Sequence, residues 1–155
     1  MPTLAYNKRA KFDYEILDIY EAGLVLHGYE VKSIKTGHIS LKGAYVALKQ
    51  TSKNLPELYL INTFVPLYKK ASSIENYNPE RSRKLLLKKN EIKHLIGKNQ
   101  EQGLTLVPIK IYTKRSLIKL EFGIGKGKKK IDKRESIKKR EMDRKIRTLA
   151  KQKLK

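Results

Sequence analysis

Residues 104–122 read LTLVPIKIYTKRSLIKLEF, and this stretch decides the fold. Apolar and polar residues alternate through Leu104–Tyr112 and again through Leu117–Phe122, which is the period of a half-buried β-strand. The residues between these two segments, 113–116, are all polar. We therefore predict that the two strands pair as a hairpin across residues 113–116.

Further short strands are predicted upstream of this hairpin. Residues Tyr14–Tyr20 alternate in the same way, and residues 21–23 (Glu-Ala-Gly) are expected to turn the chain into a strand at Leu24–Leu26. Residues Ile39–Lys49 are predicted to form one long strand, and Glu57–Ile61 another.

Two helices are predicted between the strands. The first covers Tyr29–Thr36, and the second covers Lys88–Gln102, with Gly103 as the residue that ends it. The polar segment 71–83 is expected to be an exposed loop. Many short strands with few helices predict a mainly β protein, a small closed β-barrel with two or three flanking helices.

The charge of the chain indicates a polyanionic partner. Its 155 residues include 36 Lys and Arg against 15 Asp and Glu, a net charge of +21. Nucleic acid is the usual partner of such a protein, because each neutralised phosphate releases counterions. A membrane surface usually requires a basic amphipathic helix with Trp or Phe on its apolar face. The chain has no Trp and only three Phe, all before its basic C-terminal part.

Half of the excess charge lies in the last fifth of the chain. Residues 126–155 carry 15 basic and 4 acidic side chains, and the glycines of 123–127 are expected to end a strand and form a flexible joint. We therefore expect a β-barrel RNA-binding domain at 1–125 and a basic tail at 126–155. The tail has too few apolar residues to fold alone, so we expect it to be disordered when free and helical when bound.

Catalytic and metal-binding patterns are scarce in the sequence. There is no cysteine, and His27, His38 and His94 form no HxH or HxxxH pair of the kind typical of metal sites. The glycines before Lys128 lack the spacing of a phosphate-binding loop. We expect no cofactor and no enzymatic activity. The N-terminus has no apolar signal core and no run is long enough to span a membrane, so a cytoplasmic location is expected.

One basic cluster carries an unusual apolar insert. Residues 81–89 place three consecutive leucines, 85–87, inside a frame of Arg and Lys. Two of these leucines can pack inward, but a third on the same short segment is hard to bury. Leu86 is therefore a candidate for an exposed side chain that wedges against a base.

Five ordered blocks of sequence resemble the small protein B family, the SsrA-binding proteins that partner transfer-messenger RNA in bacterial trans-translation. The resemblance covers about residues 5–150. The blocks are Asn7–Ala10, Glu21–Leu24, Glu30–Gly37, Arg83–Leu87 and Gly127–Arg134.

The resemblance implies an oligonucleotide-binding-like β-barrel that binds RNA and performs no catalysis. Such a protein holds the tRNA-like domain of transfer-messenger RNA and delivers it to stalled ribosomes. The implied partners are this RNA, charged with alanine and carried by elongation factor Tu, and the ribosome. On the ribosome the tail would become helical in the empty messenger channel at the decoding centre of the 30S subunit. No membrane is involved, and a monomer is expected.

The resemblance also assigns roles to individual residues. RNA-contacting positions of the family fall on Asn7, Glu21, Leu86 and Lys119, surrounded by the basic residues Lys8, Arg9, Arg83 and Lys84. Ribosome-engaging positions fall in the tail, on Lys126, Lys128, Lys129, Asp132, Lys133 and Arg134. Two positions depart from the family pattern: Phe12 stands where the family often has His, and Ile131 where it has His or an aromatic residue.

Two other classes of protein share some of these features. A ribosomal or other structural RNA-binding protein could have the same barrel and basic tail, but the ordered blocks favour the small protein B family. A small RNA nuclease or RNA-modifying enzyme would need a clustered acid/base or metal site, and the sequence pattern does not indicate one.

Overall fold

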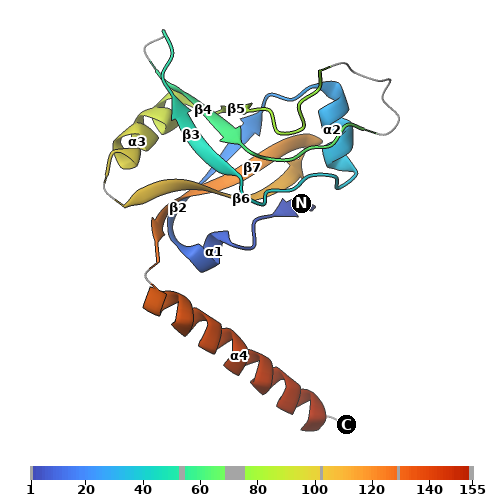
Figure 1. Cartoon of the computed structure of the whole chain (residues 1–155), viewed down its shortest axis with the longest axis vertical. Coiled ribbons are helices and arrows are strands. Elements are labelled where there is room, and N and C mark those ends of the chain that lie inside the picture. Colours follow the sequence, from blue (N-terminus) through green and yellow to red (C-terminus); the bar gives the residue numbers. More distant parts are fainter. Residues whose placement is uncertain (1, 53–54, 69–75, 102, 129, 154–155) are drawn as a thin grey trace.

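The computed structural model describes residues 2–52, 55–68, 76–101, 103–128 and 130–153. In these residues one antiparallel seven-stranded sheet, with the strand order β1-β6-β7-β2-β5-β4-β3, is accompanied by four helices (Figure 1). The predicted mainly β class is therefore confirmed. The strands are β1 Thr3–Tyr6, β2 Tyr14–Leu24, β3 Tyr45–Lys49, β4 Glu57–Ile61, β5 Arg83–Leu86, β6 Leu104–Lys114 and β7 Leu117–Gly127. The helices are α1 Ala10–Asp13, α2 Gly28–Lys35, α3 Lys89–Asn99 and α4 Lys130–Lys153.

The predicted hairpin is formed by β6 and β7, and both strands are longer than expected. The turn is confined to Arg115 and Ser116, whose φ angles of 51° and 65° fit a two-residue hairpin loop. At its other end β7 runs through Gly127, so residues 123–127 form the end of a strand, as predicted, but they pair with β2 throughout and do not form a separate joint. A Cβ atom on Gly123 would lie 2.7 Å from the Asp18 carbonyl oxygen, so this glycine permits close packing in the sheet.

Three other predicted elements differ from the structure. No turn occurs at 21–23, because Gly23 pairs on both sides, with Leu86 of β5 and with Lys119 of β7. The long strand expected from Ile39 is reduced to β3, since a turn with φ of +76° at Gly43 precedes it. Helix α3 ends at Asn99, before Gly103. Strand β4 and helix α2 lie where they were predicted, α2 shifted by one residue.

The sheet curls without closing. Strand β3 packs against β6, but among the described residues no ladder joins the edge strands β1 and β3. The expected closed barrel is therefore not formed. The concave side of the sheet holds the core, which includes Leu60, Ile111, Leu120 and Phe122, and α3 contributes Leu95 to it. Helices α2 and α3 lie at opposite ends of the body, and α4 projects away from it (Figure 1).

A buried carboxylate, that of Glu30, connects α2 to the start of β5. The Glu30 side chain has no exposed surface and accepts hydrogen bonds from Arg83 Nε at 2.8 Å and from Arg81 Nε at 3.1 Å. Arg83 is itself buried and donates to the carbonyl oxygens of Thr63 at 2.7 Å and Pro79 at 2.9 Å. One network thus joins three segments that are distant in sequence.

The environment of Glu30 keeps it charged. Burial by itself would raise the pKa of this carboxyl group, but the hydrogen bonds from Arg81, from the backbone N–H of His27 and from Arg83 together lower the pKa. Because the pKa in the folded state is lowered, the ionised group stabilises the fold above its ordinary value of 4.5. This contribution is lost as the pH falls through the lower pKa of the folded state.

We predict that Glu30→Gln lowers the free energy of unfolding by about 3 kcal/mol at neutral pH, because two arginines lose their buried counter-charge. Urea denaturation measures this value. The control Lys98→Ala removes a surface ion pair with Glu101 of 3.3 Å and should change stability by less than about 0.5 kcal/mol. On acidification below the ordinary carboxyl pKa, the wild type should lose stability more steeply than Glu30→Gln. Equal stability and equal acid dependence of the two proteins would contradict this role.

Candidate nucleic-acid interface

A row of residues crosses four neighbouring strands on one face of the sheet. Leu86 in β5 lies opposite Gly23 in β2, Gly23 lies opposite Lys119 in β7, and Lys119 lies opposite Tyr112 in β6. We call these four residues the Leu86 row. A Cβ atom on Gly23 would lie 3.4 Å from Leu86 Cβ and 3.7 Å from Lys119 Nζ. The row thus brings together Leu86 and Lys119, two predicted contacts that are 33 positions apart in the sequence.

Glu21 lies beside the Leu86 row, two residues before Gly23 and on the same face of β2. Its carboxylate accepts a short hydrogen bond from the Tyr112 hydroxyl and one of 3.4 Å from Lys114 Nζ. The hydrogen bond from Tyr112 is the main cause of the lowered pKa of Glu21, and Lys114 adds to it. Glu21 is therefore an exposed anion held in a fixed position at the edge of the row.

Tyr112 and Lys114 are part of this arrangement, although the family resemblance assigned no role to them. Burial and the hydrogen bond to Glu21 raise the pKa of the Tyr112 hydroxyl, so Tyr112 remains a neutral donor. The hydroxyl and the carboxylate belong to residues 91 positions apart in sequence. No local pattern could have indicated the pair.

Leu86 is exposed, as predicted. Its side chain has 53% of its surface accessible, whereas Leu85 is buried and Leu87 half-buried. The strand geometry explains this result, because successive side chains of β5 point to opposite faces. The neighbouring Lys84 is partly exposed and forms an ion pair of 3.2 Å with Glu57 of β4.

Arg83 does not share this exposure. Its guanidinium group is buried against Glu30 and backbone carbonyl oxygens, as described above. A direct contact between Arg83 and RNA, as the resemblance implied, does not fit this burial. In the described structure Arg83 positions the start of β5.

Asn7, Lys8 and Arg9 lie at a different part of the surface, in the turn between β1 and α1. Asn7 donates from its side-chain amide to the Pro108 carbonyl oxygen at 2.8 Å, about four residues along β6 from Tyr112, or roughly 13 Å of strand. Lys8 and Arg9 are exposed, and Arg9 pairs with Asp13 at 3.3 Å. The structure therefore separates this turn from the Leu86 row.

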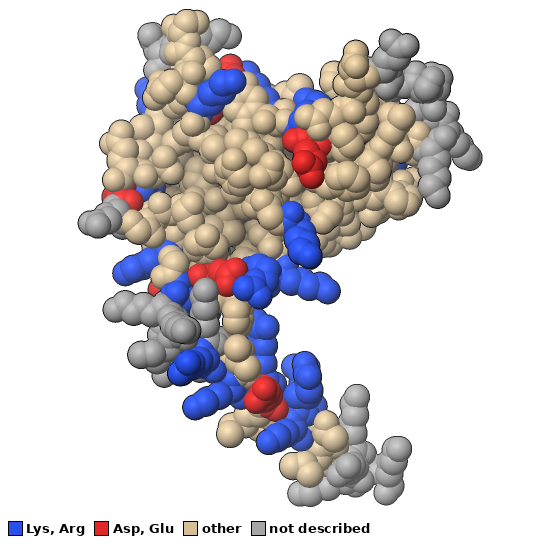
Figure 2. All heavy atoms as spheres, in the orientation of Figure 1, with Lys and Arg blue, Asp and Glu red and all other residues tan. Residues whose placement is uncertain are grey.

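The basic tail begins beside this turn. Lys126 is in β7, the backbone N–H of Lys128 donates to the Asp13 carbonyl oxygen at 2.9 Å, and α4 follows. The guanidinium groups of Arg9 and Arg140 lie 4.9 Å and 5.5 Å from the centre of the Phe12 ring. Figure 2 shows Lys and Arg gathered along α4 and at the adjoining edge of the body.

The tail residues implied by the resemblance are only partly described. Arg134 is exposed on α4, and Asp132 and Lys133 belong to the first turn of this helix, where only the backbone is described. Lys129 lies outside the described residues. Among the described side chains of α4, four large apolar ones are exposed: Ile137, Met142, Ile146 and Leu149.

The part of the chain that the structure describes contains no cluster of three or more His, Cys, Asp or Glu side chains that could hold a metal ion. None of its helices is long and apolar enough to cross a membrane.

A curled antiparallel sheet that presents lysines and an exposed leucine, followed by a strongly basic helix, is typical of an RNA-binding protein. The model of the SmpB protein family matches residues 4–152. The SsrA-binding protein of Thermosipho africanus is 48% identical over 94% of this chain and 95% of its own length. That of Oceanobacillus iheyensis is 46% identical over 92% and 89% of the two chains.

A solved structure gives the same result. A chain from the study titled "tmRNA-SmpB: a journey to the center of the bacterial ribosome" is similar, with a TM-score of 0.62 and 44% identity. The similarity covers 81% of the present chain and 84% of the other. The protein described here therefore belongs to the SmpB family.

Proposed function

We propose that this chain binds the tRNA-like domain of transfer-messenger RNA and delivers this RNA to stalled ribosomes in trans-translation. Its relatives are named SsrA-binding proteins, and the similar solved structure is titled as a complex of this RNA with SmpB. The Leu86 row is the observation that carries the proposal for this chain. It puts an exposed apolar side chain next to a lysine and a fixed carboxylate, on one face of the sheet.

The proposed division of work within the row follows from the chemistry of its side chains. Lys119 meets a phosphate group, and Leu86 packs against a base. Glu21 accepts hydrogen bonds from base amino groups, in addition to those from Tyr112 and Lys114. Lys84 adds positive charge beside Leu86. Asn7, Lys8 and Arg9 form a second contact region, and Arg83 supports the surface from within.

The curled sheet also supports a finer statement about the fold. We propose that it is a partly open relative of the oligonucleotide-binding barrel, a fold whose strands often leave one side incompletely closed. The β1 and β3 edges would form that open side. The protein would act as a monomeric adaptor without catalytic activity or cofactor, at work on the ribosome and thus in the cytoplasm.

The tail is proposed to engage the ribosome rather than transfer-messenger RNA. Lys126, Lys128, Lys129, Lys133 and Arg134 would meet ribosomal RNA in the empty messenger channel, with Asp132 near the decoding centre of the 30S subunit. Delivery would involve the alanyl-charged RNA with elongation factor Tu. Because β7 runs to Gly127, we propose a boundary between body and tail after Lys128 in place of the one expected after residue 125.

We predict that Leu86→Ala weakens binding to the tRNA-like domain by about 1–3 kcal/mol, because an exposed apolar contact at the centre of the interface is lost. Gel-shift titration measures the affinity, and circular dichroism checks the fold. Leu117→Ala is the matched control, since Leu117 is similarly exposed (60%) but lies at the hairpin turn. Equal affinities of the wild type and Leu86→Ala would remove Leu86 from the interface.

We predict that Lys119→Ala lowers the slope of log affinity against log salt concentration by roughly one unit, because one phosphate contact is lost. Titrations at four or five salt concentrations measure the slope. Lys49→Ala, which removes an exposed lysine from the edge strand β3, should leave the slope unchanged. A fall in affinity with an unchanged slope would show that Lys119 does not contact a phosphate.

We predict that truncation after Lys128 separates the two proposed functions. The truncated protein keeps every strand of the sheet and should retain specific binding of the tRNA-like domain, with some loss of non-specific attraction. It should not support peptide tagging in a reconstituted assay on a messenger without a stop codon. Joint replacement of Asp132, Lys133 and Arg134 by Ala should cause much of the same loss. Efficient tagging by the truncated protein would refute the role of the tail.

A further inference from the structure

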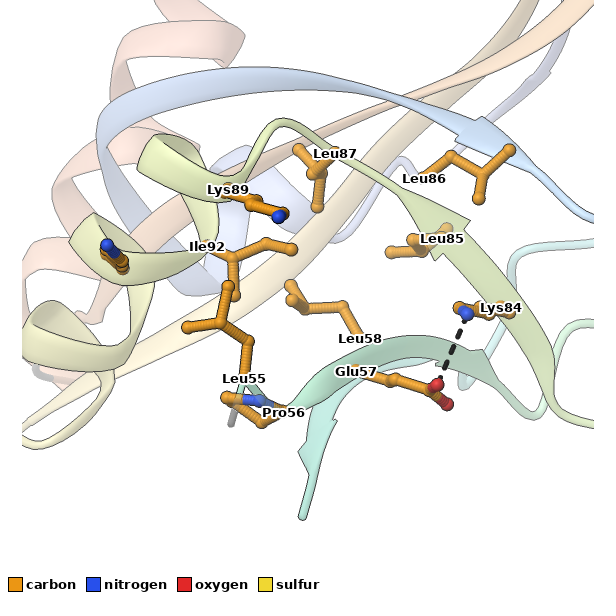
Figure 3. Close-up of a pocket in the computed structure, with 11 residues that line it drawn as sticks. Leu55, Pro56, Glu57, Leu58, Lys84, Leu85, Leu86, Leu87, Lys89 and Ile92 are labelled. Carbon is orange, nitrogen blue, oxygen red and sulfur yellow. Dashed lines mark hydrogen bonds and ion pairs between the residues drawn. The ribbon is translucent and has the colours of Figure 1, made fainter. Parts of the chain in front are cut away.

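An apolar groove lies next to the Leu86 row, between β4, β5 and α3 (Figure 3). Its volume is about 710 Å³. Leu58 and Leu85 are buried and form its floor, while Leu55, Leu87 and Ile92 are half-buried along its walls. We call it the Leu87 groove. Leu86 and Lys84 line it as well, so the groove is continuous with the surface proposed to bind RNA.

The rim of the Leu87 groove is positively charged. Lys84, Lys89 and Lys93 line it, and the acid among its lining residues is Glu57. The Glu57 carboxylate pairs with Lys84 at 3.2 Å and accepts a hydrogen bond from the Tyr59 hydroxyl at 2.6 Å. Lys89 and Lys93 are exposed and four residues apart, so they project from the same side of α3. An occupant should therefore be apolar in its middle and negatively charged at its ends.

We propose that the Leu87 groove binds one unpaired nucleotide of the RNA held by the Leu86 row, an inference that rests on the function proposed above. The flat base would lie against Leu87 and Ile92, and the flanking phosphates would meet Lys89 and Lys93. The walls offer few hydrogen-bonding groups for base edges, so the groove should accept different bases. An apolar protein segment is the alternative occupant. The shared residues Leu86 and Lys84 favour RNA.

The first test uses photocrosslinking in the full-length protein. A benzoylphenylalanine residue in place of Lys93 should crosslink to one unpaired nucleotide of the tRNA-like domain, identified by the stop of reverse transcription. The same residue in place of Lys98, on the same helix but outside the residues that line the groove, should give no such crosslink. A crosslink only at the control position, or none at either, would overturn the inference.

The second test uses one substitution that fills the groove and a double substitution that removes two lysines from its rim. Ile92→Trp should weaken binding of the tRNA-like domain about tenfold, the order expected for loss of one apolar contact at an interface, because the larger side chain fills the space proposed for the base. The double variant Lys89→Ala/Lys93→Ala should lower the salt slope by about 1.4, or 0.7 for each phosphate on a single strand. The control Lys98→Ala should bind like the wild type. If Ile92→Trp does not fold, the lysine variant and the crosslink decide.

These outcomes separate the inference from the function on which it rests. If the wild type does not bind the tRNA-like domain, both fail. If the wild type binds, Leu86→Ala binds weakly and the groove variants bind as well as the wild type, the RNA-binding function stands and the groove does not hold a nucleotide. A Lys93-position crosslink to a ribosomal protein instead of RNA, in the ribosome complex, would likewise overturn the inference.

Discussion

The buried carboxylate of Glu30 constrains the part of the molecule that carries Leu86. Arg83, its fully buried arginine partner, is the first residue of β5, and Leu86 is the last. The same guanidinium group donates to the carbonyl oxygens of Thr63 and Pro79. A strand of only four residues at this place has few ladder hydrogen bonds of its own. The hydrogen bonds and ion pairs between Glu30 and the two arginines therefore help to fix β5 in place, because so short a strand is held by few ladder hydrogen bonds.

The open edge of the sheet is a second constraint. An unpaired strand edge exposes backbone groups that could pair with another chain. Here β1 and β3 are short, and Asn7 continues β1 with two hydrogen bonds to β6, at the irregular pairing around Pro108. Pro108 cannot donate to the ladder, and the irregularity accommodates it. Asn7 therefore has a structural role that is independent of RNA. Its substitution would disturb the attachment of β1 to β6 as well as the proposed RNA contact.

The sequence predicted the surface better than the interior. Leu86 was found because three adjacent leucines cannot all be buried on a short strand, and the alternation of β5 exposes the middle one. Arg83 was assigned to the surface because it belongs to a basic cluster, but its partner Glu30 lies 53 positions away. Gly123 was interpreted as part of a joint after the strand. A side chain at this position would collide with the Asp18 carbonyl oxygen, so the strand requires a glycine here. In each error the deciding contact was with a residue far away in the sequence, Glu30 for Arg83 and Asp18 for Gly123, and a local sequence pattern does not contain such contacts.

Charge and apolar contact have different parts in the proposed recognition. The net charge of +21 attracts any polyanion over a distance set by the salt concentration, and it cannot distinguish one RNA from another. Leu86 and the Leu87 groove act only at contact, because apolar burial has no long-range component. An RNA whose phosphates contact the lysines, but which has no unpaired nucleotide near the Leu87 groove, would lack the apolar contact. Selectivity on this face would then come from the shape of the RNA, since lysines at the rim of the groove attract every phosphate equally.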